Sequence, residues 1–238
     1  MSDLNEEFVS ELYHRYADDL RAVREEQRAL RAGRAAMRTQ LDDIEAEITY
    51  LLLRWFQPGH VTEIGCLHGW STTWILRALR DNDHGRLTSV DLIDNARGNV
   101  PAELAKVGWQ FQRGDAREIF STWSQEIDYL FIDAAHTASF ARWYLDRIFP
   151  ALSEAVPVSV HDVFHRRRPL PFSEASEVLK WLRGQEITYF TASRAKAPQT
   201  YTRLERLRRE LGLTHDISDS QRNPMIYFHM AGRTAPTG

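Results

Sequence analysis

The stretch EIGCLHGWS, residues 63–71, decides the fold of this chain. It follows an apolar run at 60–64 and leads into a helical pattern at 70–81, so it predicts a strand-to-helix turn. Gly65 and Gly69 lie four residues apart, which lets the backbone turn sharply and approach a ligand closely. The free N–H groups of the following helix then point towards that ligand. The stretch therefore predicts the first crossover of a parallel α/β sheet, with a binding loop at the end of its first strand.

Short apolar runs alternate with helical patterns from residue 56 to residue 238. This alternation is typical of one Rossmann-like, doubly wound, mostly parallel α/β domain. The predicted strands are 60–64, 86–91, 109–112, 128–133, 156–161, 187–191 and 225–230. The predicted helices are 70–81, 101–106, 137–150, one that starts at Ser173, and one near 200–211.

Residues 1–55 are predicted to form a helical N-terminal extension, because apolar residues recur at helical spacing and no proline precedes Pro58. Gly33 is the expected weak point, which favours two helices or one kinked helix over an uninterrupted rod. Three roles remain open for this extension: packing on its own domain, forming a homodimer or higher homo-oligomer, or covering the site as a lid. The apolar stripe consists of Leu4, Phe8, Leu12, Tyr16, Leu20, Val23, Leu30, Met37, Leu41, Ile44, Ile48 and Leu51.

Composition predicts a cytoplasmic globular protein with a small-molecule partner. Of 238 residues 43% are hydrophobic and 26% are charged, and no apolar run approaches the roughly 18 residues of a membrane span. The acidic start MSDLNEEF is unlike a secretory signal, and the single Cys66 excludes an internal disulfide and a cysteine zinc site. The net charge of −3 disfavours nucleic acid as a partner.

Acidic residues stand at the strand ends where a nucleoside-type cofactor would bind. Glu63 would repel a pyrophosphate but suits an ammonium group, and the GxxxG spacing differs from the GxGxxG of dinucleotide sites. Asp91 ends the second strand, where it can accept hydrogen bonds from a ribose diol. Asp115 follows the third strand and can receive an exocyclic amine. An ammonium group, a ribose and an adenine amine together describe S-adenosylmethionine, although small residues at GxxxG spacing also serve helix packing.

On these residues the chain resembles class I S-adenosylmethionine-dependent methyltransferases, specifically the small catechol-type O-methyltransferases and their bacterial natural-product relatives. The resemblance covers about residues 56–165 and is best at VTEIGCLHGWSTTWILRAL, residues 61–79, which is similar to the family's glycine-rich first motif. It implies O-methylation of a small hydroxylated molecule, such as a secondary metabolite. The residues that it implies at the cofactor are Glu63, Gly65, Cys66, Gly69, Trp70, Ser71, Asp91, Leu92, Asp115, Ala116 and Asp133.

Acids and histidines end the fourth and fifth predicted strands, in the stretches DAAH at 133–136 and HDVFH at 161–165. The carboxyl ends of neighbouring parallel strands face the ligand, so these groups should converge on the substrate side of the site. Two carboxylates with imidazoles nearby suit a divalent cation, either Mg²⁺ or a metal that tolerates nitrogen better.

The family resemblance assigns roles to these residues. Asp133 matches the family's aspartate at the fourth strand, and Asp162 matches the aspartate of its Asp-Asn pair. His136 stands where the family has a lysine general base, and a histidine can take that proton at neutral pH. Val163 replaces the asparagine, so the third ligand is either missing or supplied by His161 or His165; the candidate metal set is Asp133, His161 and Asp162.

Other functions and other roles remain open on the sequence alone. An NAD-dependent oxidoreductase is disfavoured by GxxxG and by Glu63. A non-catalytic binding subunit, or an enzyme that uses the sulfonium for another displacement, is not separated by sequence. His136 can also be a helix-capping or surface histidine, and Arg166–Arg168 can either clamp an anionic substrate group or form a solvated loop.

Overall fold

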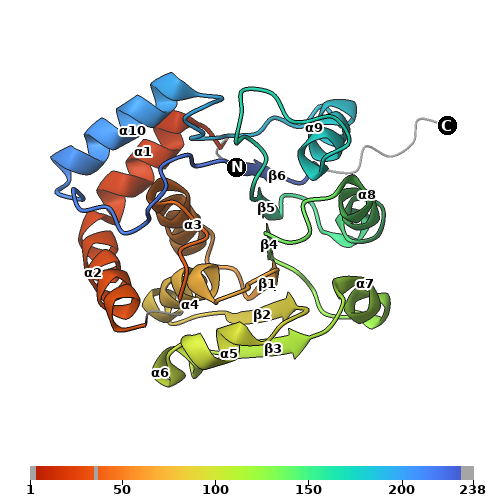
Figure 1. Ribbon diagram of the computed structural model, residues 1–238, viewed down its shortest axis with the longest axis horizontal. Helices are drawn as coiled ribbons and strands as arrows, with labels where there is room; N and C mark the ends of the chain where they lie inside the picture. Colours follow the sequence, from red (N-terminus) through yellow and green to blue (C-terminus); the bar gives the residue numbers. More distant parts are fainter. Residues whose placement is uncertain (1–3, 35–36, 232–238) are drawn as a thin grey trace.

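A six-stranded sheet forms the middle layer of the structure (Figure 1), a computed structural model that describes residues 4–34 and 37–231. The strand order is β3-β2-β1-β4-β5-β6, and every neighbouring pair is parallel except β5 with β6. The order reverses between β1 and β4, so the carboxyl ends of these two strands frame a crevice. The expected Rossmann-like, doubly wound sheet is confirmed. The strands are β1 His60–Ile64, β2 Arg86–Asp91, β3 Trp109–Arg113, β4 Tyr129–Ile132, β5 Pro157–Val160 and β6 Ile226–His229.

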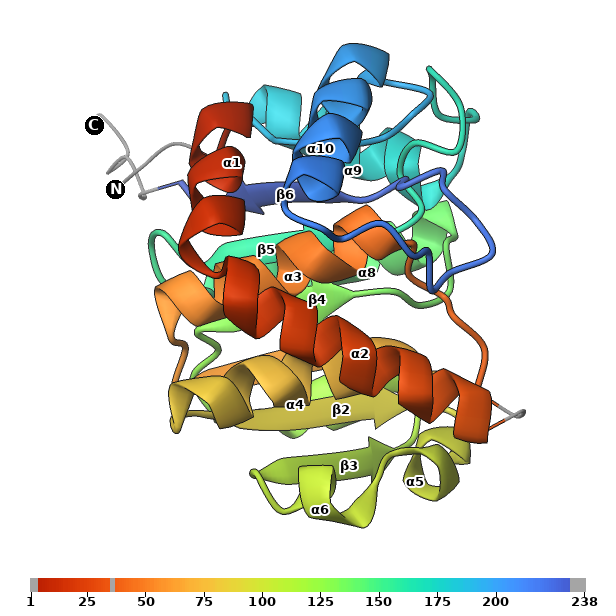
Figure 2. The same cartoon turned by 90° about the vertical axis from the view of Figure 1, so that its left-hand side faces the viewer.

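Helices cover both faces of the sheet, and each face has its own hydrophobic core. On one face lie α7 Ala116–Ile119, α8 Ala138–Arg147 and α9 Glu174–Gly184, with the short turns η1 Phe120–Thr122 and η2 Phe149–Ala151. The other face carries α3 Asp43–Phe56, α4 Trp70–Asn82, α5 Asn95–Asn99 and α6 Ala102–Ala105. Outside that layer lie α1 Glu6–Arg15, α2 Ala17–Gly33 and α10 Pro198–Glu210, as Figure 2 shows. None of the described helices is long and apolar enough to cross a membrane.

The N-terminal segment forms three helices, where the sequence predicted two or one kinked helix. α1 and α2 are separated at Tyr16, whose φ of −110° and ψ of 23° leave the helical region. α2 ends at Gly33, the expected weak point. The apolar stripe packs within the chain: Phe8, Leu12, Leu20 and Val23 are at most 6% exposed and share one core with α4, β1 and β2. The homodimer expected through this segment stays a prediction.

The prediction of a strand at 187–191 is wrong. Only an isolated antiparallel bridge between Phe190 and Tyr227 forms there. Beyond that bridge the Thr191 hydroxyl donates to the Met225 carbonyl at 2.7 Å and accepts from the Ser193 N–H at 3.1 Å, so the chain turns away from β6. The helix predicted at 101–106 is reduced to α6, and α5 before it was not predicted. The other predicted elements after residue 56 agree with the structure within three residues at each end.

Glu63 joins three elements of the core through its carboxylate. It lies on β1, is fully buried, and accepts hydrogen bonds from the hydroxyls of Ser71 at 2.5 Å, Thr72 at 2.8 Å and Ser89 at 2.5 Å. Ser71 and Thr72 belong to the first turn of α4 and Ser89 to β2. Burial raises the pKa of Glu63 to about 7, although the three hydroxyls oppose the shift.

Replacing Glu63 by glutamine should change how stability depends on pH. The pKa of Glu63 is about 7 in the folded chain, against an ordinary value of 4.5, so the folded state binds the proton more tightly than the unfolded state. Between these pH values, rising pH therefore lowers the free energy of unfolding, by about 3 kcal/mol for the full shift. We expect Glu63→Gln to gain stability relative to the unsubstituted chain between pH 5 and pH 8, measured by denaturant unfolding. The exposed Glu103→Gln controls for the lost charge; a constant difference between Glu63→Gln and the unsubstituted chain would contradict the prediction.

Candidate active site

A cavity of about 510 Å³ lies along the carboxyl ends of β1, β2, β3 and β4, at the reversal of strand order. Its volume is that of a typical small-molecule or cofactor site. Of the residues predicted at the site, those lining it are Gly65, Asp91, Leu92, Asp115, Ala116, Asp133, His136, His161 and Asp162. The cavity therefore brings together residues from the ends of five parallel strands, β1 to β5.

The turn after β1 follows the predicted geometry. Gly65 has a φ of +85°, and a Cβ at this position would lie 1.9 Å from the carbonyl oxygen of Asp133. Gly69 has a φ of +84° and is the N-cap of α4, where a Cβ would lie 2.9 Å from Val100. Only glycine fits at Gly65, so the backbone of the turn can lie directly against the end of β4. Gly65 lines the cavity, whereas Gly69 packs towards α5.

Asp91 and Asp115 line the part of the cavity where the sequence predicted a nucleoside. The Asp91 carboxylate accepts from the backbone N–H groups of Cys66 at 2.8 Å and Leu67 at 2.7 Å, and so ties β2 to the turn after β1. Asp115 caps α7 by accepting from the Arg117 N–H at 2.8 Å. Next to it, Ala116 and Phe140 make the cavity wall apolar, as the flat face of an adenine requires.

Five residues predicted at the cofactor do not line the cavity. Glu63, Cys66, Trp70 and Ser71 are buried behind the turn, and Gly69 lies beside them. Glu63 faces the first turn of α4, where hydroxyl groups satisfy its carboxylate, and not the cavity. We therefore assign the Glu63 side chain a structural role, in place of the predicted contact with an ammonium group. The backbone of the turn, not these side chains, faces the ligand space.

Asp133, His136 and Asp162 form a compact polar group at one end of the cavity. His136 Nε2 lies 3.2 Å from Asp162 Oδ2 and 3.5 Å from Asp133 Oδ1. His136 has a φ of +44° and Asp162 a φ of +58°, so tight turns after β4 and β5 direct the two side chains towards each other. One potential ligand atom from each of the three residues lies within 4.8 Å of the other two. Within the described part of the chain, this is the group whose geometry suits a metal ion.

Glu174 orients His136 and was missed by the sequence analysis. It is the first residue of α9, is buried, and its carboxylate contacts His136 Nδ1 at 3.0 Å and the Tyr144 hydroxyl at 3.0 Å. Burial lowers the pKa of His136, but the Glu174 hydrogen bond and the charges of Asp162 and Asp133 outweigh it, so the pKa lies above 6.5. The only sequence signal for Glu174 is an acid after the helix-capping Ser173, which marks a helix start and not a site.

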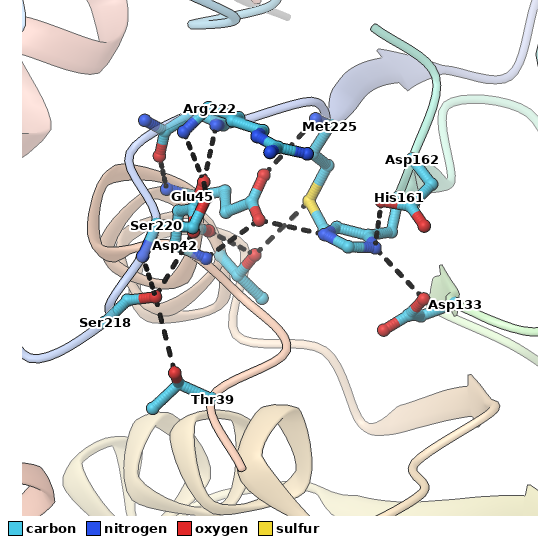
Figure 3. Close-up of polar contacts among 12 residues, drawn as sticks. Thr39, Asp42, Glu45, Asp133, His161, Asp162, Ser218, Ser220, Arg222 and Met225 are labelled. Carbon is cyan, nitrogen blue, oxygen red and sulfur yellow. Dashed lines mark hydrogen bonds and ion pairs between the residues drawn. The ribbon is translucent and has the colours of Figure 1, made fainter. Parts of the chain in front are cut away.

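His161 is enclosed between carboxylates, as Figure 3 shows. Its Nε2 lies 2.9 Å from Glu45 of α3, and its Nδ1 lies 3.0 Å from Asp133 and 3.1 Å from Asp162. Burial lowers the pKa of His161, but Asp133 and Glu45 outweigh it and raise the pKa well above 6.5. Both ring nitrogens of His161 therefore contact carboxylates. The group whose geometry suits a metal ion contains His136, where the sequence analysis had placed His161.

Comparison with known proteins supports the same region. Residues 62–163 match the family model of a methyltransferase domain. No curated protein matches the chain by sequence. The solved O-methyltransferase TomG of Streptomyces achromogenes, which is involved in tomaymycin synthesis and was solved with S-adenosylmethionine, is 14% identical with a TM-score of 0.57, over 90% of each chain.

Two further solved structures share the fold. An O-methyltransferase from Bacillus cereus, solved with S-adenosylhomocysteine, is 14% identical with a TM-score of 0.57, over 89% of this chain and 90% of that one. A methyltransferase from Geobacter sulfurreducens is 16% identical with a TM-score of 0.56, over 88% and 89%.

The residues that match the methyltransferase domain begin within β1 and end just after β5, so they include every strand end that lines the cavity. The doubly wound sheet of this chain is the fold that it shares with these structures. The chain therefore matches a methyltransferase domain over residues 62–163, in a fold that it shares with these solved methyltransferases.

Proposed function

We propose that the chain is a class I, S-adenosylmethionine-dependent methyltransferase that transfers the methyl group to a hydroxyl oxygen of a small molecule, and that His136 accepts the hydroxyl proton. The observation that carries the proposal is the orientation of His136: Nδ1 is held by Glu174, and Nε2 is directed between Asp133 and Asp162 at the end of the cavity. The names of two of the structures above, both O-methyltransferases, support oxygen as the accepting atom.

The chemistry of the transfer assigns a part to each group. When bound, S-adenosylmethionine supplies a methyl group on a sulfonium, which the acceptor oxygen attacks in line while the carbon–sulfur bond breaks. The hydroxyl proton must leave in the same process, and a neutral histidine whose Nδ1–H donates to Glu174 can take it on Nε2. Asp91 and the turn after β1 hold the cofactor's position, and that positioning supplies much of the rate.

We further propose that Asp133 and Asp162 hold a divalent cation. Their oxygens and the neighbouring imidazole form a donor set that suits Mn²⁺, Fe²⁺ or Zn²⁺, and the carboxylates alone suit Mg²⁺. A cation there would lower the pKa of the acceptor hydroxyl. Because His136 belongs to the same compact group, a second candidate role for it is that of third ligand.

We also propose that the methyl acceptor is a small molecule. The volume of the cavity and the net charge of −3 support a small-molecule acceptor, such as a secondary metabolite, over nucleic acid. The cytoplasmic location stays a prediction. Use of the sulfonium for another displacement, or a non-catalytic role, would appear as cofactor binding without methylated product.

Cofactor binding should depend on Asp91. We expect isothermal titration calorimetry to show binding of S-adenosylhomocysteine and none of NAD. Asp91→Asn should weaken that binding by about 10-fold or more. One oxygen of the Asp91 carboxylate accepts from the turn and the other accepts from the Ile93 N–H, whereas an amide has only one accepting oxygen. Asp94→Asn, an exposed acid nearby that pairs with Arg113, is the matched control and should bind as the unsubstituted chain does. Equal affinity in both variants would contradict the assignment of Asp91.

Replacing His136 should separate catalysis from cofactor binding. We expect His136→Gln to lower the turnover number about 10²- to 10⁴-fold, the usual contribution of a general base, with little change in S-adenosylhomocysteine affinity. Release of S-adenosylhomocysteine in the presence of a set of hydroxylated acceptors measures the rate. An unchanged turnover number would remove His136 from the role of base.

Metal binding can be measured without an acceptor. We expect Mn²⁺ to bind with one-to-one stoichiometry in electron paramagnetic resonance titrations, and Asp133→Asn and Asp162→Asn to abolish it. If His136 is a base and not a ligand, His136→Gln should still bind Mn²⁺; loss of binding in this variant would make it the third ligand. If Mn²⁺ does not bind to the unsubstituted chain, the proposed cation site is wrong, and the proposed methyl transfer is unaffected.

A further inference from the structure

We propose that a second, smaller cavity beside the cofactor cavity binds an anionic group of the methyl acceptor. This inference rests on the proposed methylation of a hydroxyl group, and it narrows the acceptor to one chemical class: a small molecule that carries both a hydroxyl and a carboxylate or phosphate.

The second cavity adjoins the reacting groups. Its volume is about 200 Å³, and it lies between the segment that follows β5 and the start of α9. His136 and Asp162 line both this cavity and the cofactor cavity, so the two cavities meet at this pair. A cavity of about 150 Å³ is enough to hold benzene, so this one has room for a single substituted ring. A molecule seated in it can present its hydroxyl to His136 while the cofactor occupies the larger cavity.

Positive charge lines the outer wall of the second cavity and has no partner within the chain. Arg166 and Arg168 line it, are exposed, and make no hydrogen bond or ion pair with any residue that the structure describes. Guanidinium groups bind carboxylates and phosphates through paired, charge-assisted hydrogen bonds, so these two side chains suit an anion.

The acids nearest to this wall already have partners. Asp162 contacts His165 at 2.6 Å and His136 at 3.2 Å, and Glu174 contacts His136 and Tyr144. These carboxylates are therefore directed towards imidazoles and a phenol, and not towards the arginines. The positive charge of Arg166 and Arg168 is left available to a ligand.

The rest of the second cavity suits an apolar ring on a fixed support. Val163 and Ala175 are buried in its wall, and Leu170 lines it as well. The segment that carries the arginines is anchored at both ends. The Phe164 N–H donates to the Pro224 carbonyl at 2.8 Å, and Ser173 forms an isolated antiparallel bridge with Thr137. An anion held by Arg166 and Arg168 would therefore sit at a defined distance from His136.

The test compares probes that differ only in charge. Protocatechuate, its neutral amide and the corresponding aryl phosphonate share one ring and one pair of hydroxyls. Titration calorimetry on the full chain loaded with S-adenosylhomocysteine measures the affinity of each. We expect the two anionic probes to bind at least 10-fold more tightly than the amide, and the ratio of phosphonate to carboxylate affinity shows which anion the site prefers.

Arginine variants test the residues themselves. Replacing Arg166 and Arg168 together by alanine should weaken the anionic probes by about 10- to 100-fold and leave the amide unchanged. Arg167→Ala is the matched control, because Arg167 is exposed on the same segment but does not line the cavity. It should bind all probes as the unsubstituted chain does.

Three results would overturn the anion site: equal binding of amide and acid, no binding of either anionic probe, or an equal loss in the Arg167→Ala control. The proposed function fails separately. It fails if S-adenosylhomocysteine is not bound or if no hydroxylated compound is methylated. If the amide is methylated as fast as the acid, methylation of a hydroxyl stands and the anion site alone is refuted.

Discussion

The close approach of the turn after β1 to the end of β4 is the constraint on which the site depends. The carbonyl of Asp133 occupies the space that any side chain at Gly65 would need. The parallel hydrogen bonds continue through this point, because the Gly65 N–H donates to Val90 at 2.8 Å and the Asp133 N–H donates to Ile64 at 2.9 Å. The turn that faces the cofactor and the first acid of the substrate side are therefore fixed by the same backbone contact. A shift of one would move the other.

The substrate side is supported from the N-terminal helices through buried charges. Glu45 at the start of α3 accepts from the Asp42 N–H and contacts His161, which in turn contacts Asp133 and Asp162 (Figure 3). Asp42 binds the chain before β6 through the N–H groups of Arg222 and Asn223. Removing one partner from a buried charged pair commonly costs about 3–5 kcal/mol, so this connection resists displacement. The helical segment that the sequence presents as an extension thus holds two acids of the site in place.

Sequence reasoning located the groups whose signals are local. Asp91, Asp115 and Asp133 follow directly from strand ends, and Gly65 from the turn that needs it. Glu174 and Glu45 escaped because their partners lie 38 and 116 residues away along the chain, and only packing brings them to His136 and His161. The strand expected at 187–191 failed for a similar reason: its apolar pattern is real, but side-chain hydroxyls take the hydrogen bonds beyond Phe190.

The charges of the site bear on the proposed binding of an anionic acceptor by Arg166 and Arg168. Asp133, Asp162 and Glu174 place three carboxylates around His136, the group that we propose receives the acceptor's proton. Burial raises the pKa of Asp162, but the His165 hydrogen bond and the charges of His161 and His136 outweigh it, so Asp162 stays ionised. A neutral acceptor would meet this group without difficulty and would need no arginine nearby. An anionic acceptor would be repelled unless its charge were held by a cationic group, and Arg166 and Arg168 line the cavity that also contains His136. A cation on Asp133 and Asp162 would reduce the same repulsion between these carboxylates and the anionic group of the acceptor. The cation and the arginines would therefore both favour binding of an anionic acceptor.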